Sequence, residues 1–265
     1  MTNTCVADEV MTYEKATEII QFVLSVGEYL QINGGEISRV EDTIQRICTA
    51  YGAERTDVFS ITSVTFVTAI WKGGIVVTQS RRVRGVEKNT YCLEAINALS
   101  REICQNPIPI DEAREKLSVA LKRKHGSKKR FLVGSLLATT SYAAFFGGDW
   151  KDILVTFAVT FVIVLCQLGS NYLGGNRILA NVLCCFCAGL AATLIGQWWG
   201  SSLTMVMSGC IMVLIPGISL TSAIENLILG DTLSGIMGAM EAVITALALA
   251  GGFALSQMLL GGIAL

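Results

Sequence analysis

Apolar residues in the first half of the chain recur every three or four positions, which is typical of helices that bury one face. Four stretches have this spacing, so the sequence predicts helices over residues 13–31, 36–51, 87–104 and 111–124. An Asn-Gly-Gly run follows the first stretch and an Asn-Pro-Ile-Pro segment follows the third, and both favour a helix end. The pattern therefore indicates separate helices rather than one long one.

Between the second and third helices the pattern changes to one typical of strands. Residues 57–83 are rich in Val, Ile, Thr and Phe on both sides of a Lys-Gly-Gly turn signal, which predicts a β-hairpin. One further short strand before the hairpin is left open. Residues 1–130 are therefore expected to form a cytoplasmic α+β domain.

The second half has long apolar runs that are interrupted only by short polar segments. A helix needs about 20 residues to cross the roughly 30 Å hydrocarbon core of a bilayer, so these runs predict about five membrane spans. The expected spans are residues 131–147, 152–170, 177–199, 202–229 and 234–263. The expected fold class is an α-helical polytopic membrane protein with an N-terminal α+β cytoplasmic domain.

The distribution of charge supports this division of the chain. Residues 1–130 hold 18 of the 20 Lys and Arg and 16 of the 21 Asp and Glu. The remaining seven charges cannot cover a water-soluble domain of 135 residues, so lipid is the expected solvent there. Six basic residues between Lys122 and Arg130 directly precede the first span, and such residues normally stay in the cytoplasm. A nucleic-acid patch is the alternative for this run, and its position beside a span argues against it.

Cysteine and histidine usage argues against several kinds of site. The nine cysteines show no zinc-like spacing with the single His125. Their odd number indicates a reducing compartment rather than a disulfide framework. The chain has no P-loop, dinucleotide fingerprint, nucleophile elbow or zinc-protease motif. We therefore expect no metal, no cofactor and no catalytic residue.

The fourth and fifth spans contain the residues that predict a transport site. Pro216 and Gly217 interrupt the fourth run, and because proline removes a backbone donor, a kink or break is expected there. Transporters line substrate sites with such broken helices, and a simple packing kink is the alternative. The full set of transport-site candidates is Pro216, Gly217, Thr221, Glu225, Asn226, Asp231 and Glu241.

Three of these candidates are carboxylates, and an ionisable group inside a bilayer is commonly functional. Glu225 is expected near the cytoplasmic edge, and Asp231 in the connection between the last two spans. Glu241 falls about two turns into the last span and is the best embedded candidate for proton coupling or gating. Structural hydrogen bonding is the alternative role for it.

Two segments resemble signature segments of the threonine/serine exporter family. Residues 34–47 read GGEISRVEDTIQRI, similar to the N-terminal motif of that family. Residues 215–224 read IPGISLTSAI and are followed by GDTLSG at 230–235, which looks like its Pro-Gly membrane motif. The resemblance covers residues from about 13 to 255. One departure is Glu225-Asn226, where a basic-acidic pair is expected from the family pattern.

The resemblance implies a bacterial inner-membrane exporter subunit with a cytoplasmic N-terminal domain and five membrane helices. Some family members fuse this unit to a shorter hydrophobic domain and others are split into two proteins. This chain looks like the larger split subunit, which implies a small hydrophobic membrane partner. Split members are associated with dicarboxylate (succinate) export and fused ones with threonine and serine. The motif positions carried over to the cytoplasmic domain are Gly35, Glu36, Ser38, Arg39 and Glu41.

Three functions follow, of which the leading one is a secondary exporter of a small polar metabolite. The second is a membrane-anchored sensor or regulator in which residues 13–124 bind a ligand. The third, a membrane-bound hydrolase, is disfavoured because the single histidine lies in a basic run beside the membrane. The expected partners are the small subunit, the lipid bilayer and a small-molecule substrate, with no nucleic acid and with a homo-oligomer left open.

Overall fold

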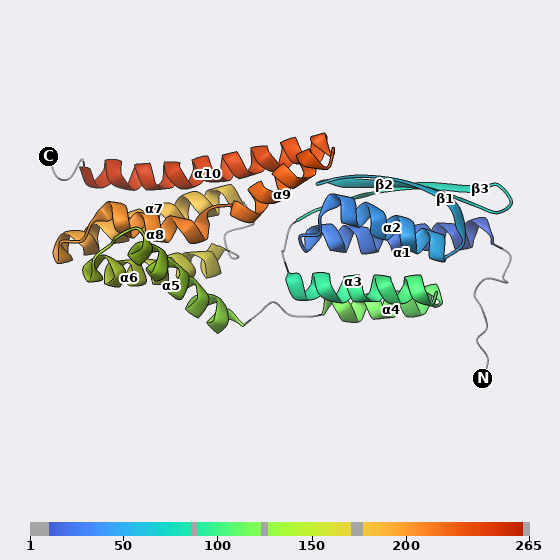
Figure 1. The fold of residues 1–265 in the computed structure, drawn as a ribbon, viewed down its shortest axis with the longest axis horizontal. Coiled ribbons are helices and arrows are strands. Elements are labelled where there is room, and N and C mark those ends of the chain that lie inside the picture. The colour runs from blue at the N-terminus through green and yellow to red at the C-terminus, as the bar shows by residue number, and fades with distance from the viewer. Residues whose placement is uncertain (1–10, 86–88, 123–126, 171–176, 262–265) are drawn as a thin grey trace. The chain divides into compact units, whose positions relative to one another are not determined.

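The computed structural model describes residues 11–85, 89–122, 127–170 and 177–261, which are mostly helical (Figure 1). The centre of the basic run, residues 123–126 with His125, lies outside the described residues, as do the first residues expected for the third helix. Contacts divide the chain into two compact units, which are considered one at a time. The first is Met1–His125 with Ser222–Met237, and the second is Gly126–Thr221 with Gly238–Leu265.

Four helices and a three-stranded sheet make up most of the first unit. The helices are α1 (Tyr13–Ile32), α2 (Ile37–Ala50), α3 (Thr90–Gln105) and α4 (Ile110–Leu121). The strands are β1 (Ala53–Ile61), β2 (Val64–Trp71) and β3 (Ile75–Arg82), antiparallel and in the order β1-β2-β3. Helices α1 and α2 pack against the sheet, and α3 and α4 pack against those helices (Figure 1).

The segment expected to form one strand up to Trp71 is divided by a turn at Thr62 and Ser63. A single strand of that length would exceed the usual 3–10 residues, and the turn folds it into β1 and β2. The expected hairpin is the β2–β3 pair. Its turn uses Gly73 and Gly74 at φ 84° and 76°, a conformation that glycine adopts without strain.

The core of the first unit is centred on Trp71, whose side chain is 1% exposed. The indole Nε1 donates a hydrogen bond of 3.2 Å to the Tyr51 carbonyl oxygen, which joins β2 to the end of α2. The Tyr51 hydroxyl in turn donates to the Ile108 carbonyl oxygen at 2.8 Å. Burial raises the pKa of Tyr51 to about 12, so this hydroxyl remains a donor at neutral pH.

The remaining helices of the chain are rich in apolar residues. They are α5 (Lys128–Phe145), α6 (Trp150–Ser170), α7 (Arg177–Trp199), α8 (Leu203–Leu214), α9 (Gly217–Ile228) and α10 (Thr232–Gly261). Among the described residues, α6, α7 and α10 are each long and apolar enough to cross a membrane. Helices α8 and α9 pass the same test only as a bent pair, which makes three spans, or four if the pair counts as one.

This number is smaller than the five spans expected from the sequence. The difference lies at residues 131–147, most of which form α5. That helix begins with Lys128, Lys129 and Arg130, so only residues 131–145 of it are uncharged, fewer than the about 20 needed to span a bilayer. A fifth span at α5 therefore stays a prediction.

Helices α5, α6 and α8 pack closely around small and hydroxylated residues. Thr160 Oγ1 on α6 donates to Thr139 Oγ1 on α5 at 2.7 Å, and both side chains are fully buried. A Cβ atom added at Gly209 on α8 would lie 2.8 Å from the Thr139 carbonyl oxygen and 2.9 Å from Ala143 Cβ. Glycine is therefore what lets the backbones of α5 and α8 approach each other.

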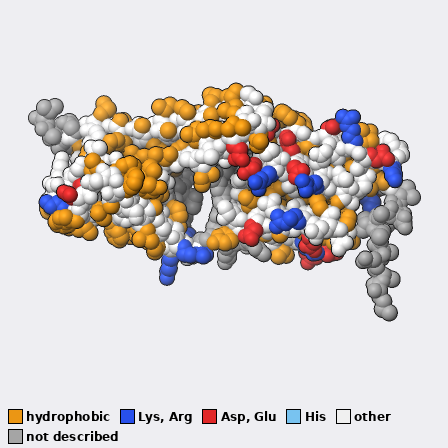
Figure 2. Space-filling model, viewed as in Figure 1, with side chains coloured by type: hydrophobic (Ala, Val, Ile, Leu, Met, Phe, Trp, Pro, Cys, Tyr) orange, Lys and Arg blue, Asp and Glu red, His pale blue; other side chains and the backbone are white. Residues whose placement is uncertain are grey.

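Large apolar side chains cover much of the outside of the second unit, where few charges are visible (Figure 2). Soluble monomers rarely expose contiguous apolar surface of this extent, whereas lipid contacts it favourably. The most exposed of these side chains, all at least 64% accessible, include Leu137, Phe145, Trp150, Trp198, Ile218, Leu247 and Met258. Together with the long apolar helices, they identify a membrane protein.

Candidate functional site

The interruption of the fourth apolar run is a sharp bend at Pro216. Helix α8 ends at Leu214, Ile215 is extended (φ −58°, ψ 132°), and α9 begins at Gly217, with 54° between the two helices. Pro216 has no N–H to donate to the Met212 carbonyl, and the Gly217 N–H bonds to Ile215 O at 2.8 Å instead of continuing the helix. The bend therefore follows directly from the proline.

Thr221 lies one turn into α9 and is exposed. Its hydroxyl donates a 2.9 Å hydrogen bond to the Gly217 carbonyl oxygen. This bond runs back to the carbonyl four residues earlier within α9, and such bonds often bend helices. Thr221 therefore adds to the bend that begins at Pro216.

A tight turn at Gly230 (φ 93°) joins α9 to α10. The Asp231 N–H donates to the Asn226 carbonyl at 2.8 Å, and the Gly235 N–H donates to the Asp231 carbonyl at 2.9 Å. A Cβ at Gly235 would lie 2.5 Å from Leu227 Cγ, so the two helices touch at a glycine. Asn226 and Asp231 are therefore brought together by the turn.

The three candidate carboxylates are divided between the two units. Glu225 is exposed on α9, and Asp231 is half-buried after Gly230. Glu241 belongs to the second unit and is exposed on α10. Among the described residues, none of the three forms an ion pair.

In the first unit, the motif residues surround the start of α2. A Cβ at Gly35 would lie 2.9 Å from the Leu30 carbonyl oxygen, so only glycine fits between α1 and α2. Glu36 stands at the N-cap position and pairs with Arg39 at 2.8 Å. Both side chains reach solvent, and such pairs contribute at most about 1 kcal/mol. Ser38 is half-buried beside them.

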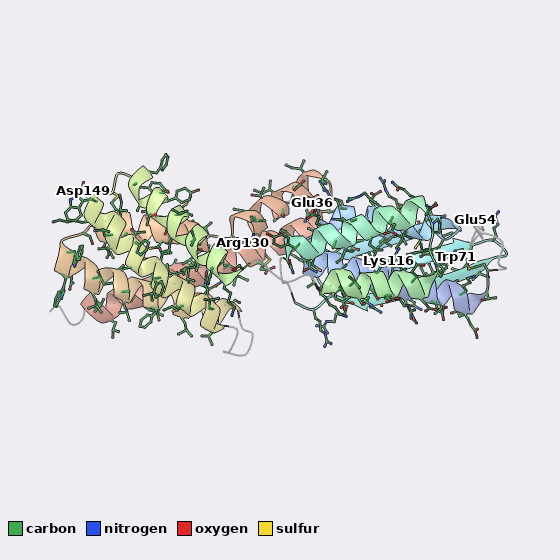
Figure 3. All side chains as sticks on the ribbon, turned by 90° about the horizontal axis from the view of Figure 1, so that it is seen from below. Glu36, Glu54, Trp71, Lys116, Arg130 and Asp149 are labelled. Atoms are coloured by element: carbon green, nitrogen blue, oxygen red, sulfur yellow. The ribbon has the colours of Figure 1, made fainter. Side chains whose placement is uncertain are left out.

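Figure 3 labels Glu36 at one end of this domain and Glu54 toward the other. The two residues flank α2, which runs between them along the sheet. The motif therefore occupies one end of the domain rather than its centre.

Glu41 is the motif residue with the most specific contact. Its Oε1 accepts a hydrogen bond of 2.6 Å from the Ser60 N–H, which joins α2 to the end of β1. Burial raises the pKa of Glu41, this hydrogen bond lowers it, and the charge of Asp231 raises it again. Asp231 lies in Ser222–Met237, which belongs to the same unit as Glu41, and its charge is the smallest of these three effects on the Glu41 pKa.

Buried polar side chains lie next to this contact. Gln31 Nε2 donates to Thr65 Oγ1 at 3.2 Å, and Ser60 Oγ bonds to the same oxygen at 3.1 Å. All three side chains are at least 92% buried, and the Gln31 Oε1 atom has no hydrogen-bond partner. The sequence alone does not predict this cluster, because isolated Thr and Ser residues are ordinary in strands.

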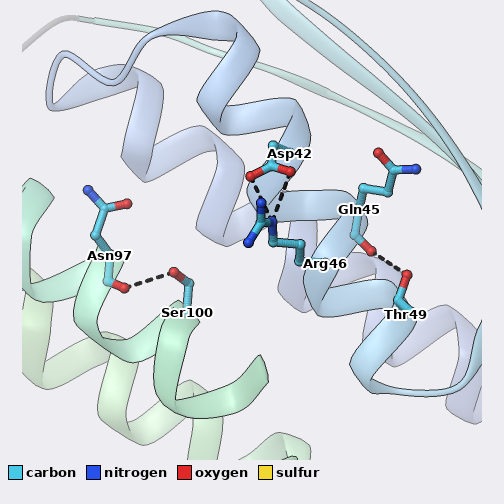
Figure 4. Close-up of polar contacts among 6 residues, drawn as sticks. All are labelled: Asp42, Gln45, Arg46, Thr49, Asn97 and Ser100. Carbon is cyan, nitrogen blue, oxygen red and sulfur yellow. Dashed lines mark hydrogen bonds and ion pairs between the residues drawn. The ribbon is translucent and has the colours of Figure 1, made fainter. Parts of the chain in front are cut away.

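A polar groove lies between α2 and α3, part of which Figure 4 shows. Arg46 Nε lies 2.9 and 2.8 Å from the two carboxylate oxygens of Asp42, within the first signature segment. Facing them on α3 are Asn97 and Ser100, whose hydroxyl donates to the Asn97 carbonyl. The groove encloses about 390 Å³ and is open to solvent.

One residue that the sequence analysis missed is Asp152 on α6, which is 5% exposed. Its two carboxylate oxygens accept backbone hydrogen bonds from Asp149 (2.9 Å) and Ser202 (2.7 Å). Ser202 is the N-cap residue of α8, so Asp152 fixes the start of the broken helix pair. A lone Asp near a span end is an unremarkable signal, which is why spacing alone did not reveal it.

These features define the protein as a polytopic helical membrane protein with one sharply bent helix pair and a separate small-sheet domain. The family model ThrE, described as a threonine/serine exporter, matches residues 21–260, and the chain belongs to this family. The resemblance predicted from the two signature segments is thereby confirmed. No curated protein and no solved structure matches the chain.

Proposed function

We propose that this protein is a subunit of a secondary-active exporter that moves a small polar metabolite out of the cytoplasm. The observation that carries the proposal is the 54° bend between α8 and α9 at Pro216, in a chain of the threonine/serine exporter family. Threonine or serine is the first substrate class, and a dicarboxylate such as succinate is the second.

The bend supports a substrate site through its backbone groups. The Met212 carbonyl has lost its helical donor, and the N-terminus of α9 at Gly217 carries the positive end of a helix dipole. Helix ends of this kind receive substrate carboxylates in transporters with broken helices. Both substrate classes carry a carboxylate that such a site could hold.

The scarcity of basic side chains in the second half of the chain favours a zwitterionic substrate over a dianion. After residue 130 the only basic residues are Lys151 and Arg177. A dianion would leave more negative charge to be neutralised than an amino acid does, and an uncompensated charge in a bilayer is costly. Succinate export therefore requires cations from the partner subunit or from the cytoplasmic domain.

The remaining elements of the proposal concern assembly and orientation. Five crossings with α5 as the first would leave the N-terminal domain in the cytoplasm and the C-terminus outside a bacterial inner membrane. The basic residues Lys128, Lys129 and Arg130 before α5 support this orientation. A small hydrophobic partner would complete the transporter, as expected for the larger subunit of a split member.

The test is counterflow in proteoliposomes that contain this chain with and without a small hydrophobic subunit encoded beside it. We expect saturable exchange of labelled threonine, serine or succinate only when both proteins are present. Exchange of none of the three by the reconstituted pair would refute the proposal. Full exchange by the chain alone would refute the proposal that a partner subunit is required.

A further inference from the structure

A second groove of the first unit lies between α1, β3 and α4 and encloses about 320 Å³. This volume falls at the lower end of the range for small-molecule sites. Apolar side chains, among them Phe22 and Leu117, line one part of it, and two arginines, Arg81 and Arg114, line another. Neither signature segment contributes to this groove, and nothing in the proposed transport function uses it.

Arg81 is held in place but keeps unused donors. Its Nη1 donates to Ser25 Oγ at 2.8 Å and to Glu28 Oε2 at 3.2 Å. The Arg81 and Glu28 side chains are only 35% and 23% exposed, so the pair is partly desolvated. Both contacts use Nη1, and among the described residues neither Nε nor Nη2 forms a hydrogen bond.

Arg114 supplies a second guanidinium from α4. Within the described residues Arg114 forms no ion pair, whereas Lys116 on the same helix pairs with Glu102 and Glu112. Among the described residues that line the groove, the two arginines are the only charged ones, and Glu28 offsets the charge of one of them, which leaves a net positive charge beside the apolar lining. An anion with a short carbon chain complements both features, because guanidinium groups bind carboxylates with paired donors.

We propose that this groove binds a small carboxylate metabolite, with Arg81 and Arg114 holding the carboxylate and the Phe22–Leu117 side contacting the carbon chain. Phosphate shares the charge but has no carbon chain for the apolar lining. The site would let the cytoplasmic domain sense the metabolite pool. The assignment stands on the first unit alone and does not depend on the exporter function.

The test is calorimetric titration of the full-length protein in lipid nanodiscs at fixed ionic strength, with succinate as the probe. Its uncharged diamide and inorganic phosphate are the comparison ligands. We expect succinate to bind, the diamide to give no signal, and phosphate to bind at least roughly tenfold more weakly. Equal binding of phosphate would overturn the carboxylate assignment, and absence of succinate binding would overturn the site.

Arg114→Gln is the informative variant, because the Arg114 side chain is exposed. A lost charge-assisted hydrogen bond weakens binding by roughly tenfold or more. Arg82→Gln is the matched control, since Arg82 follows Arg81 on β3 and adjacent strand residues face opposite ways. Unchanged affinity in Arg114→Gln, with a wild-type melting temperature, would contradict the proposal. If the protein binds succinate but exchanges no substrate, the proposed exporter function is wrong and the proposed carboxylate site still stands.

Discussion

The carboxylate of Asp152 on α6 accepts a 2.7 Å hydrogen bond from the backbone N–H of Ser202, fifty positions further along the chain. Its other oxygen accepts from the Asp149 N–H at 2.9 Å. Because Ser202 is the N-cap residue of α8, one buried side chain sets the start of both α6 and α8. The bent pair is thereby anchored at the end away from its break.

Replacing Asp152 should therefore destabilise the second unit. Asp152→Ala leaves two backbone donors without their partner, and each buried unsatisfied group costs about 1–3 kcal/mol. We expect a lower melting temperature in detergent and a smaller drop for Asp152→Asn, which keeps one acceptor. Asp149→Ala is the control, because that side chain is exposed and only its backbone takes part. Equal melting of Asp152→Ala and the wild type would show that these bonds contribute nothing.

The close approach of α8 to α5 predicts a second effect. Gly209→Leu would push side-chain atoms against the Thr139 carbonyl and Ala143, so α5 and α8 must separate. We expect a loss of monodisperse protein in size-exclusion chromatography and a melting temperature lower by several degrees. Gly134→Leu on α5 is the matched control, since a Cβ there meets nothing within 4 Å. A well-behaved Gly209→Leu protein would contradict the packing described for these helices.

The raised pKa of Glu41 predicts that the stability of the protein depends on pH. Its pKa lies above the usual value of 4.5 because burial disfavours the charged form. A carboxyl with a raised folded-state pKa contributes stability below its unfolded pKa and loses it as pH rises through the folded value. The wild type should therefore lose stability relative to Glu41→Gln as pH increases from about 4 toward neutrality. Melting curves across this range check the sign.

Glu54→Gln is the control for that series, because the Glu54 side chain is exposed. The difference in melting temperature between Glu54→Gln and the wild type should stay constant with pH. If the difference in melting temperature between Glu41→Gln and the wild type were also constant with pH, burial would not raise the pKa of Glu41, and the prediction would be wrong.

Much of this architecture could be predicted from the sequence, because it rests on periodicity and on residues with strong backbone preferences. The helices of the first unit, the turn at Gly73 and Gly74 and the break at Pro216 all follow from such local signals. The division between β1 and β2 did not, since Thr62 and Ser63 are weak turn formers beside strong strand formers.

The functional candidates were harder to predict because they depend on residues distant in sequence. Three features form only in the tertiary fold. They are the hydrogen bond between Glu41 and Ser60, the hydrogen bond between Asp152 and Ser202, and the groove that Arg81 and Arg114 both line. The fifth span at α5 stays a prediction, because three leading basic residues shorten the apolar segment there.

The central claim is that the proline break forms the substrate site, and two adjacent residues separate this role from general packing. Pro216→Ala restores a backbone donor for the Met212 carbonyl and allows α8 and α9 to straighten. A Cβ at Gly217 meets nothing within 4 Å, so Gly217→Ala should leave the bend unchanged.

Counterflow of labelled threonine and succinate in proteoliposomes containing both subunits tests this claim most directly. For whichever substrate the wild type exchanges, we expect Pro216→Ala to lower the initial rate by about tenfold or more, the effect of one lost 1.4 kcal/mol interaction. Gly217→Ala should retain the wild-type rate. Equal rates for the wild type and Pro216→Ala, with all proteins equally folded, would contradict the account.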